Sequence, residues 1–260
     1  MSGGTVTVLG SCGAWPEPGR ACSGFLLERN GFRVVLDLGY GTLPRLLSLV
    51  DSVVGDGIDA VVITHRHPDH MIDLHGLFRA RWFGRRASPA IPVYAPPGVL
   101  ERVALLEEDD TEAVREVFDW HEIPAVPEDL GPYRLETYAL PHFVPNVGIR
   151  LSCKDFTIAY TGDTGPDPAL AELGRDADLY IVEATSRDQQ SGTPPGSSVQ
   201  QLLLTARDAG AAAATAGACR LMLTHFWPGN DRERSGTEAA QVYGGEILIA
   251  DEGRTVALGR

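Results

Sequence analysis

The sequence predicts a single globular domain of the mixed α/β or α+β class. Short runs rich in valine, leucine and isoleucine alternate along the chain with segments of helical spacing. The 260 residues are 43% hydrophobic and 22% charged, which is ordinary for a globular protein with a sizeable core. Because no obvious repeat, linker or low-complexity tract divides the chain, we expect residues 1–260 to form one domain.

The first part of the chain opens with three strand-like runs, which glycine and proline residues separate by turns. Residues 59–63 are mostly apolar and β-branched, and they have the length of a buried strand. Apolar positions with helical spacing follow, and Pro97 favours the first turn of another helix. We therefore expect strands at 5–9, 24–28, 33–37, 59–63 and 93–95, and helices at 43–50, 71–81 and 97–107.

The second part repeats this style, with strand-like runs before two helical segments. The segment 198–217 is rich in alanine and leucine, which favours a helix, although Gly210 could divide it into two pieces. We expect strands at 133–139, 147–151, 156–160, 178–183 and 221–224, helices at 198–217 and 231–243, and a closing hairpin of strands 246–250 and 255–258 across Asp251-Glu252-Gly253.

A cluster of metal-binding residue types follows the predicted strand 59–63 directly. His65 and His67 alternate on one side of the chain and can bind one ion together, whereas Asp69 and His70 lie past the turn and can reach a second ion. Imidazole nitrogen and carboxylate oxygen suit zinc and other borderline divalent metals. One histidine alone would more often cap a strand or face solvent, but three imidazoles and a carboxylate within six residues predict a metal centre.

Three further donors occupy the same kind of position, each where a predicted strand meets a loop: His142, Asp163 and His225. Each of the two histidines would by itself be taken as structural. Their repeated placement at strand ends is what converging metal ligands require. His75 and His121 match no ligand pattern, and we expect them at the surface or behind the site.

The pattern His-x-His-x-Asp-His, together with these later donors, resembles the metallo-β-lactamase superfamily. The resemblance implies an α+β fold, a four-layer αββα sandwich with two ions at one edge. It further implies that Asp37 is structural and accepts backbone N–H groups near the site. The implied ligands are His65, His67 and His142 for one ion, Asp69, His70 and His225 for the other, and Asp163 as the bridge between them.

Later motifs are similar to those of the ribonuclease Z-like branch, which cleaves phosphodiesters, and the similarity covers nearly the whole chain. Two histidines of that branch are absent: Val182 replaces the His of a His-Glu-Ala-Thr motif, and Leu203 stands where a helper His would assist the leaving group. Only twenty residues separate His142 from Asp163, which leaves no room for the tRNA-gripping arm of that family. The chain therefore looks closer to small bacterial relatives that hydrolyse cyclic nucleotides. The motifs are Thr161-Gly162-Asp163-Thr164, Val182-Glu183-Ala184-Thr185 and Leu223-Thr224-His225-Phe226.

The expected function is that of a dinuclear metal-dependent hydrolase, a phosphodiesterase for a small phosphodiester such as a cyclic nucleotide, acting through a metal-bridging hydroxide. Asp69 is the expected catalytic residue, because it could both bind a metal and orient that hydroxide. The cofactors would be two divalent ions per chain, with zinc expected and manganese or iron as alternatives. Candidate substrate contacts are Ser23, Arg81 and Thr185.

Two other functions stay open at this point. The same metal site could serve a lactonase or another ester hydrolase, for example in a biosynthetic pathway. Alternatively, the protein could bind metal without catalysis. A tRNA 3′ endonuclease is disfavoured, because the formal net charge of −13 repels a polyanion whose binding depends on neutralising its phosphates.

Composition also limits location and partners. No apolar run reaches 18 residues and the N-terminus lacks signal-peptide features, so we expect a cytoplasmic protein without membrane contact. The expected partner is a small molecule and not a nucleic acid polymer, and the chain could act alone or as a homodimer. The four cysteines are expected to be reduced, with a redox or metal role open for Cys12 and Cys22. A basic segment at 79–86 could face the site or be a solvated helix end.

Overall fold

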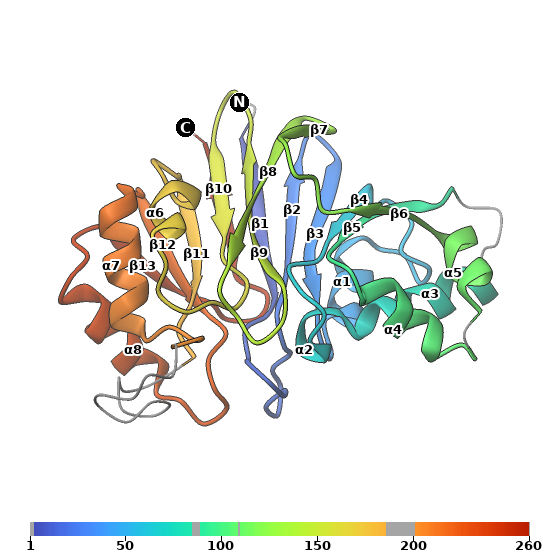
Figure 1. The fold of residues 1–260 in the computed structure, drawn as a ribbon, viewed down its shortest axis with the longest axis horizontal. Helices are drawn as coiled ribbons and strands as arrows, with labels where there is room; N and C mark the ends of the chain where they lie inside the picture. The colour runs from blue at the N-terminus through green and yellow to red at the C-terminus, as the bar shows by residue number, and fades with distance from the viewer. Residues whose placement is uncertain (1–2, 85–88, 109, 186–200, 260) are drawn as a thin grey trace.

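Two seven-stranded sheets pack face to face, and helices cover the outer face of each (Figure 1). This four-layer αββα arrangement is the predicted fold. The computed structural model describes residues 3–84, 89–108, 110–185 and 201–259. Among these residues, no helix is both long enough and apolar enough to cross a membrane.

The first sheet has the strand order β14-β1-β2-β3-β4-β5-β6. From β3 to β6 its strands run parallel, so their carboxyl ends meet at one edge of the sheet. Helices α1–α5 lie on the outer side of this sheet (Figure 1). The elements are β1 (Gly4–Gly10), β2 (Gly24–Arg29), β3 (Phe32–Leu38), α1 (Leu43–Leu49), β4 (Ala60–Val62), α2 (Pro68–Met71), α3 (Asp73–Gly84), β5 (Ile91–Ala95), α4 (Val99–Leu105), α5 (Thr111–Val117) and β6 (Phe118–Glu122).

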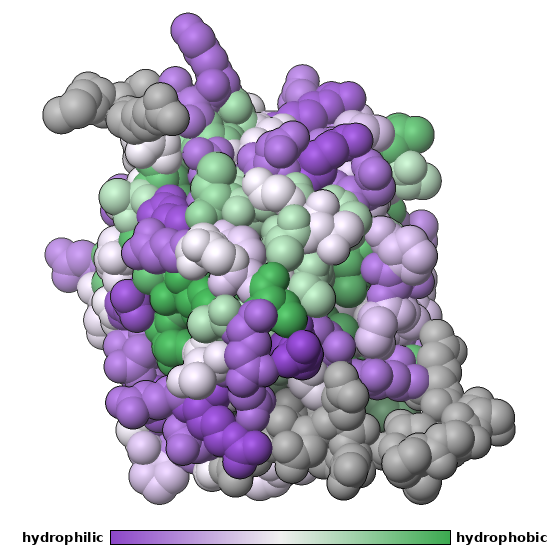
Figure 2. All heavy atoms as spheres, turned by 90° about the vertical axis from the view of Figure 1, so that its left-hand side faces the viewer, coloured by the Kyte–Doolittle hydropathy of each residue, from purple (hydrophilic) through white to green (hydrophobic). Residues whose placement is uncertain are grey.

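The second sheet has the order β13-β12-β11-β10-β9-β8-β7, and its strands β10–β13 are also parallel. Helices α6–α8 cover its outer face, where polar side chains surround a smaller apolar patch (Figure 2). The elements are β7 (Glu128–Leu130), β8 (Tyr133–Leu140), β9 (Asn146–Ser152), β10 (Thr157–Tyr160), α6 (Ala169–Leu173), β11 (Leu179–Glu183), α7 (Ala206–Ala216), β12 (Arg220–Thr224), α8 (Arg232–Ala240), β13 (Glu246–Ile249) and β14 (Thr255–Leu258).

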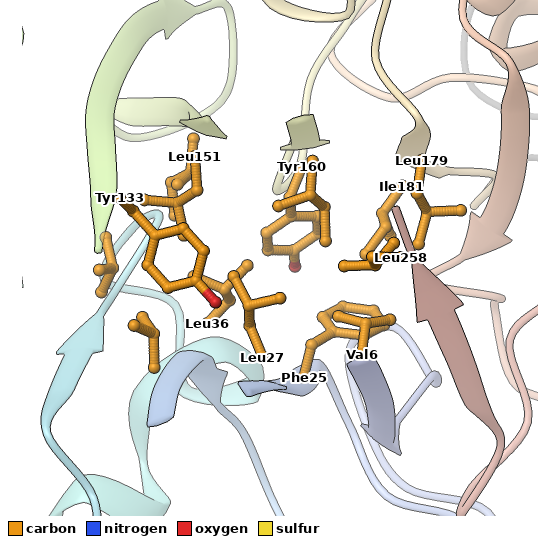
Figure 3. Close-up of a cluster of buried hydrophobic side chains, with 14 of the residues drawn as sticks. Val6, Phe25, Leu27, Leu36, Tyr133, Leu151, Tyr160, Leu179, Ile181 and Leu258 are labelled. Atoms are coloured by element: carbon orange, nitrogen blue, oxygen red, sulfur yellow. The ribbon is translucent and has the colours of Figure 1, made fainter. Parts of the chain in front are cut away.

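The central core lies between the two sheets, where side chains of opposing strands point toward one another (Figure 3). Phe25 of β2 meets Tyr160 of β10 edge to face, with ring centroids 5.2 Å apart. Burial of apolar surface of this kind is the main favourable term in folding. Two further cores fill the spaces between each sheet and its helices. The two sheets are therefore fixed against each other, which fixes the edges that carry the predicted ligands.

The predicted closing hairpin is wrong. Strand β13 pairs in parallel with β12 of the second sheet, whereas β14 pairs antiparallel with β1 of the first sheet. Between them the backbone bonds to β1, since Val8 exchanges hydrogen bonds with Gly253 and Arg254. Sequential strands usually pair, but here each strand buries its apolar side chains by completing a different sheet.

Other differences concern helix limits and short elements. The predicted helix 71–81 is divided, because α2 ends at Met71 and α3 begins at Asp73. Helix α7 starts at Ala206, and residues 198–200 of its predicted range lie outside the described residues. Gly210 does not break α7; a Cβ there would lie 2.7 Å from the Ala239 carbonyl, so glycine permits the close approach of α8. Helices α5 and α6 and strands β6 and β7 were not predicted from the sequence.

Candidate metal centre

The seven predicted ligands lie at the carboxyl ends of strands from both sheets. His65 and His67 follow β4, and Asp69 and His70 lie on α2, at the lower edge of the molecule in Figure 1. The remaining three come after strands of the second sheet, with His142 after β8, Asp163 after β10 and His225 after β12. Because parallel strands of each sheet end at one edge, these loops converge, and the structure brings all seven side chains together in two groups.

The first group, called cluster one, consists of His65, His67, His142 and Asp163. His67 Nδ1 lies 3.0 Å from His65 Nε2 and 3.1 Å from His142 Nε2. The His142 Nδ1–H donates to the Leu202 carbonyl at 3.2 Å, which leaves Nε2 as the free donor atom for a metal. His67 is half-buried, whereas His65 is fully buried, so cluster one is reached from the His67 side.

The second group, called cluster two, consists of Asp69, His70, Asp163 and His225. His225 Nε2 lies 3.3 Å from Asp69 Oδ2, and His70 Nε2 lies 3.7 Å from the same oxygen. The Asp69 Oδ2 atom also accepts the backbone N–H of Ala14 at 2.7 Å. The Ala14 loop therefore fixes the carboxylate predicted to act in catalysis.

Asp163 belongs to both clusters and turns one oxygen toward each. Its Oδ2 lies 3.9 Å from His65 Nε2 and 3.6 Å from His142 Nε2. Its Oδ1 lies 3.2 Å from His70 Nε2 and 3.1 Å from His225 Nε2. This is the arrangement that a carboxylate between two cations requires.

The donor atoms fit a pair of divalent cations. Ligands at about 2.0–2.2 Å from a tetrahedral ion are roughly 3.3–3.6 Å apart, and the distances above range around that value. Within the described residues, His70 Nε2 and Asp163 Oδ1 are buried and make no hydrogen bond. Buried polar atoms without partners are costly, so their convergence fits a site that binds a cation.

The pKa shifts of the histidines differ between the two clusters. Burial lowers the pKa of His65, His67 and His142, so these imidazoles tend toward the neutral form that binds metal. Burial would also lower the pKa of His70 and His225, but the Asp163 carboxylate beside them raises both. Despite burial, these histidines keep the pKa of Asp163 well below its ordinary value.

Asp37 supports the site through hydrogen bonds of its carboxylate, and it accepts a backbone N–H as predicted. It has a left-handed backbone conformation with φ of 57°, which is uncommon outside glycine. Its carboxylate accepts the Thr64 backbone N–H at 2.7 Å and the Tyr160 hydroxyl at 2.8 Å. Its Oδ2 also accepts from His70 Nδ1 at 2.7 Å, which points His70 Nε2 into cluster two.

Thr185, a predicted substrate contact, lies beside His225. Its side chain is buried, and its hydroxyl lies 2.7 Å from His225 Nδ1 and donates to Glu183. Burial, with the nearby Asp163 charge, raises the pKa of Glu183 to about 8. Thr185 and Glu183 therefore orient His225 through its Nδ1 atom, so that Nε2 faces cluster two. The motif Val182-Glu183-Ala184-Thr185 was recognised in the sequence, but this role was not.

Neither of the other two predicted substrate contacts is exposed. Ser23 is fully buried, and its backbone N–H donates to the Asp69 carbonyl, so it supports α2. Arg81 is 5% exposed, and its guanidinium donates to the carbonyls of Val54, Gly55 and Pro89. Through these contacts Arg81 holds two loops together.

Several residues around the centre escaped sequence analysis. A Cβ on Gly13 would lie 2.6 Å from the His225 ring, and one on Gly39 would lie 1.9 Å from the Asp69 carbonyl. Glycine at these positions lets two loops approach the donors closely, which glycine-rich segments could have signalled. The Leu202 carbonyl, which accepts from His142, carries no signal in the sequence.

The remaining histidines and cysteines stay outside both clusters. His75 pairs with Glu107 and His121 with Asp119. The four cysteines form no disulfide, as expected. Burial raises the pKa of the Cys12 and Cys22 thiols, so both are held as thiols. Neither belongs to a candidate metal group among the described residues.

Fold and donor geometry together define a protein of the metallo-β-lactamase fold. The Beta-lactamase superfamily domain matches residues 21–226, so the chain belongs to that superfamily. The probable metallo-hydrolase YhfI of Bacillus subtilis is 28% identical over 252 residues, which are 95% of this chain and 97% of that protein. The ribonuclease Z of Mycolicibacterium paratuberculosis is 27% identical over 270 residues and covers 95% of both proteins.

Solved structures of similar proteins share this fold. The crystal structure of Bacillus subtilis YhfI has a TM-score of 0.84 and 26% identity, and covers 98% of this chain and 99% of that chain. The short form of human tRNase Z has a TM-score of 0.76 and 25% identity, and covers 98% of this chain and 100% of that chain. This chain is accordingly a hydrolase-type member of the superfamily, similar to metallo-hydrolases and to ribonuclease Z.

Proposed function

We propose that this protein is a dinuclear metal-dependent phosphodiesterase for small phosphodiesters such as cyclic nucleotides. The placement of Asp163 carries the proposal, because its two oxygens face the two donor clusters separately. Two divalent ions, with zinc expected, would lower the pKa of a water, clamp phosphoryl oxygens and offset developing negative charge. His65, His67 and His142 would hold one ion, Asp69, His70 and His225 the other, and Asp163 both.

Asp69 is the proposed catalytic side chain. The Ala14 N–H at 2.7 Å and His225 at 3.3 Å fix its Oδ2 atom. Its pKa is lowered, because the neighbouring histidines outweigh the opposing effect of burial. An ionised, fixed carboxylate can orient the attacking water and accept its proton.

Position 203, where a proton donor for the leaving group is expected, has no titratable side chain. Leu203 replaces a histidine there, and the adjoining Leu202 contacts His142, so this segment borders cluster one. Hydrolysis should therefore depend steeply on leaving-group pKa. Leu203→His should flatten that dependence, because the new imidazole could donate the proton.

A small substrate is favoured over tRNA by the segment between His142 and Asp163. It contains only β9, β10 and short turns, and no arm extends from it. The relatives named ribonuclease Z and metallo-hydrolase support phosphodiester chemistry as the class, and the net charge of −13 opposes a polyanionic partner.

The test uses purified protein loaded with zinc or manganese, after elemental analysis of its metal content. We expect close to two ions per chain and hydrolysis of bis(p-nitrophenyl) phosphate and of a cyclic nucleotide. A tRNA precursor should not be cleaved at a meaningful rate. Lactone opening without diester hydrolysis would replace the proposal by a lactonase, and a filled site without any hydrolysis would indicate a non-catalytic metal-binding protein.

A further inference from the structure

Three large aromatic side chains are exposed beside the donor clusters. Trp15 is 47%, Trp227 43% and Phe143 67% exposed. Trp15 follows Ala14, whose N–H donates to Asp69. Trp227 lies two residues after His225, and Phe143 follows His142 directly. Scattered exposed apolar residues need no explanation, but three that flank one polar centre indicate a contact surface for a ligand.

The two tryptophans form a pair on the side of cluster two. Their ring centroids are 5.0 Å apart at an interplanar angle of 82°, an edge-to-face arrangement. The loops that carry them are bonded together, since Gly13 N–H donates to the Phe226 carbonyl and Phe226 N–H to the Ser11 carbonyl, both at 2.9 Å. The pair is thus attached rigidly to the residues that position Asp69 and His225.

Phe143 lies beside cluster one, with its ring 5.2 Å from the His142 ring at 74°. Aromatic surface therefore borders both clusters. The loop segments 11–15 and 225–228 contain no lysine or arginine. Arg232 lies over the Phe226 ring, but its guanidinium is paired with Glu17 and also donates to Ser11 and to the Ala250 carbonyl. A ligand group that reaches the tryptophans accordingly meets mainly planar apolar surface, which suits an uncharged ring better than a phosphate.

We propose that Trp15 and Trp227 bind the planar, uncharged part of the substrate, a group of the nucleobase class, while its phosphodiester lies at the two donor clusters. This inference rests on the proposed phosphodiesterase function and names its substrate class. Stacking of a base on an aromatic side chain tolerates any base, because each has a π face. The pair would therefore select for a base without reading its identity.

The test compares two phosphate monoesters of ribose, one with a base and one with a hydroxyl in its place: adenosine 5′-monophosphate and ribose 5-phosphate. Calorimetry on the metal-loaded protein should give at least about tenfold tighter binding of the nucleotide, equivalent to about 1.4 kcal/mol. Trp15→Ala and Trp227→Ala should each weaken nucleotide binding about tenfold and leave ribose 5-phosphate binding unchanged. Trp15→Phe and Trp227→Phe should retain most of the preference, because they keep a ring.

Phe83→Ala is the matched control, since Phe83 is 68% exposed but lies on α3 beside Arg79. It should change neither affinity. Equal affinity of the parent for both esters, or equal weakening of both in the tryptophan variants, would overturn the inference. Hydrolysis of bis(p-nitrophenyl) phosphate by the parent separates the two proposals. Turnover without base preference rejects the tryptophan site alone, whereas tryptophan-dependent nucleotide binding without turnover rejects the phosphodiesterase.

Discussion

Asp163 is the residue on which both donor clusters depend. It is buried, and each of its oxygens faces histidines of a different cluster. A carboxylate in this position offsets the repulsion between two dications held close together. No terminal ligand has this double role, so loss of Asp163 should affect the centre more than loss of any one of them.

Asp163→Ala should therefore fold, bind at most about one ion per chain and lose nearly all hydrolytic activity. His65, His67 and His142 remain to hold the ion of cluster one. Elemental analysis and turnover of an aryl phosphodiester measure both effects. His121→Ala is the control and should behave like the parent, because His121 is half-buried outside both clusters and contacts only Asp119 and Tyr94 among the contacts described. Two ions and parental turnover in Asp163→Ala would show that the centre is not dinuclear.

Acid should release the metal ion of cluster two before that of cluster one. The pKa of His65, His67 and His142 is lowered, so cluster one stays neutral to lower pH. The pKa of His70 and His225 is raised, so protons compete with the cation of cluster two at higher pH. Dialysis from about pH 7.5 toward 5 should release one ion first, with the second lost at lower pH.

The variants His225→Ala and His67→Ala identify which ion leaves. His225→Ala should lack the ion that acid releases first, whereas His67→Ala should lack the more acid-resistant one. Simultaneous loss of both ions from the parent, or the reverse order, would contradict this assignment.

At the scale of residues, the sequence predicted donor types and positions better than supporting contacts. Few side chains bind divalent metals, so the His and Asp pattern limits the alternatives strongly. Roles such as those of Thr185 and Arg81 depend on which way a side chain points after packing. A threonine beside a ligand loop has the same sequence signal whether it faces a substrate or orients a histidine.

At the scale of elements, the missed strands share a physical cause. Strands β6 and β7 are the end strands of the two sheets, and their sequences are polar. Edge strands bury little apolar surface, so they lack the pattern by which the buried strands were recognised. The wrong hairpin has a different cause. Strands β13 and β14 have clear strand patterns, but packing against distant strands decides which strand each of them pairs with.

Helix α7 offers an element-scale prediction, because its start borders the centre. Thr205 and Asp208 form a capping box, in which the Thr205 hydroxyl accepts the Asp208 N–H and the Asp208 carboxylate accepts the Thr205 N–H. Thr205→Ala should lower the free energy of unfolding by about 1 kcal/mol, within a range of about 0.5–2. Urea unfolding at fixed metal concentration measures this loss.

Thr215→Ala is the matched control for that variant. Thr215 lies in the last turn of the same helix, is exposed, and donates only to the Ala211 carbonyl among its described hydrogen bonds. It should change stability by less than about 0.5 kcal/mol. An equal loss of stability in both variants would mean that any threonine-to-alanine change in this helix has the same effect and that the capping box contributes nothing specific.

At the scale of the whole molecule, the C-terminal strands join the two sheets. The chain leaves the second sheet at β13 and completes the first at β14, so the first sheet combines strands from both ends of the sequence, whereas the second is built from β7 to β13 alone. The core between the sheets combines residues of both halves, including Val6, Tyr160 and Leu258 (Figure 3). We therefore expect the protein to unfold as one unit, which is the test of the predicted single domain.

Metal-loaded protein in urea should accordingly show one transition, with coincident midpoints by tryptophan fluorescence and far-UV circular dichroism. Fluorescence is measured in a Trp227→Phe background, in which Trp15, Trp82 and Trp120 report the first sheet, whereas circular dichroism reports both sheets. Leu258→Ala should move both curves together and lower stability by about 2–5 kcal/mol, because Leu258 is 1% exposed in the core between the sheets. Ala257→Ser, at an exposed position of the same strand, should have an effect below about 0.5 kcal/mol. A core shared by both sheets transmits the loss of stability to both of them. If Leu258→Ala shifted the fluorescence curve alone, the sheets would therefore unfold independently and the chain would contain two domains.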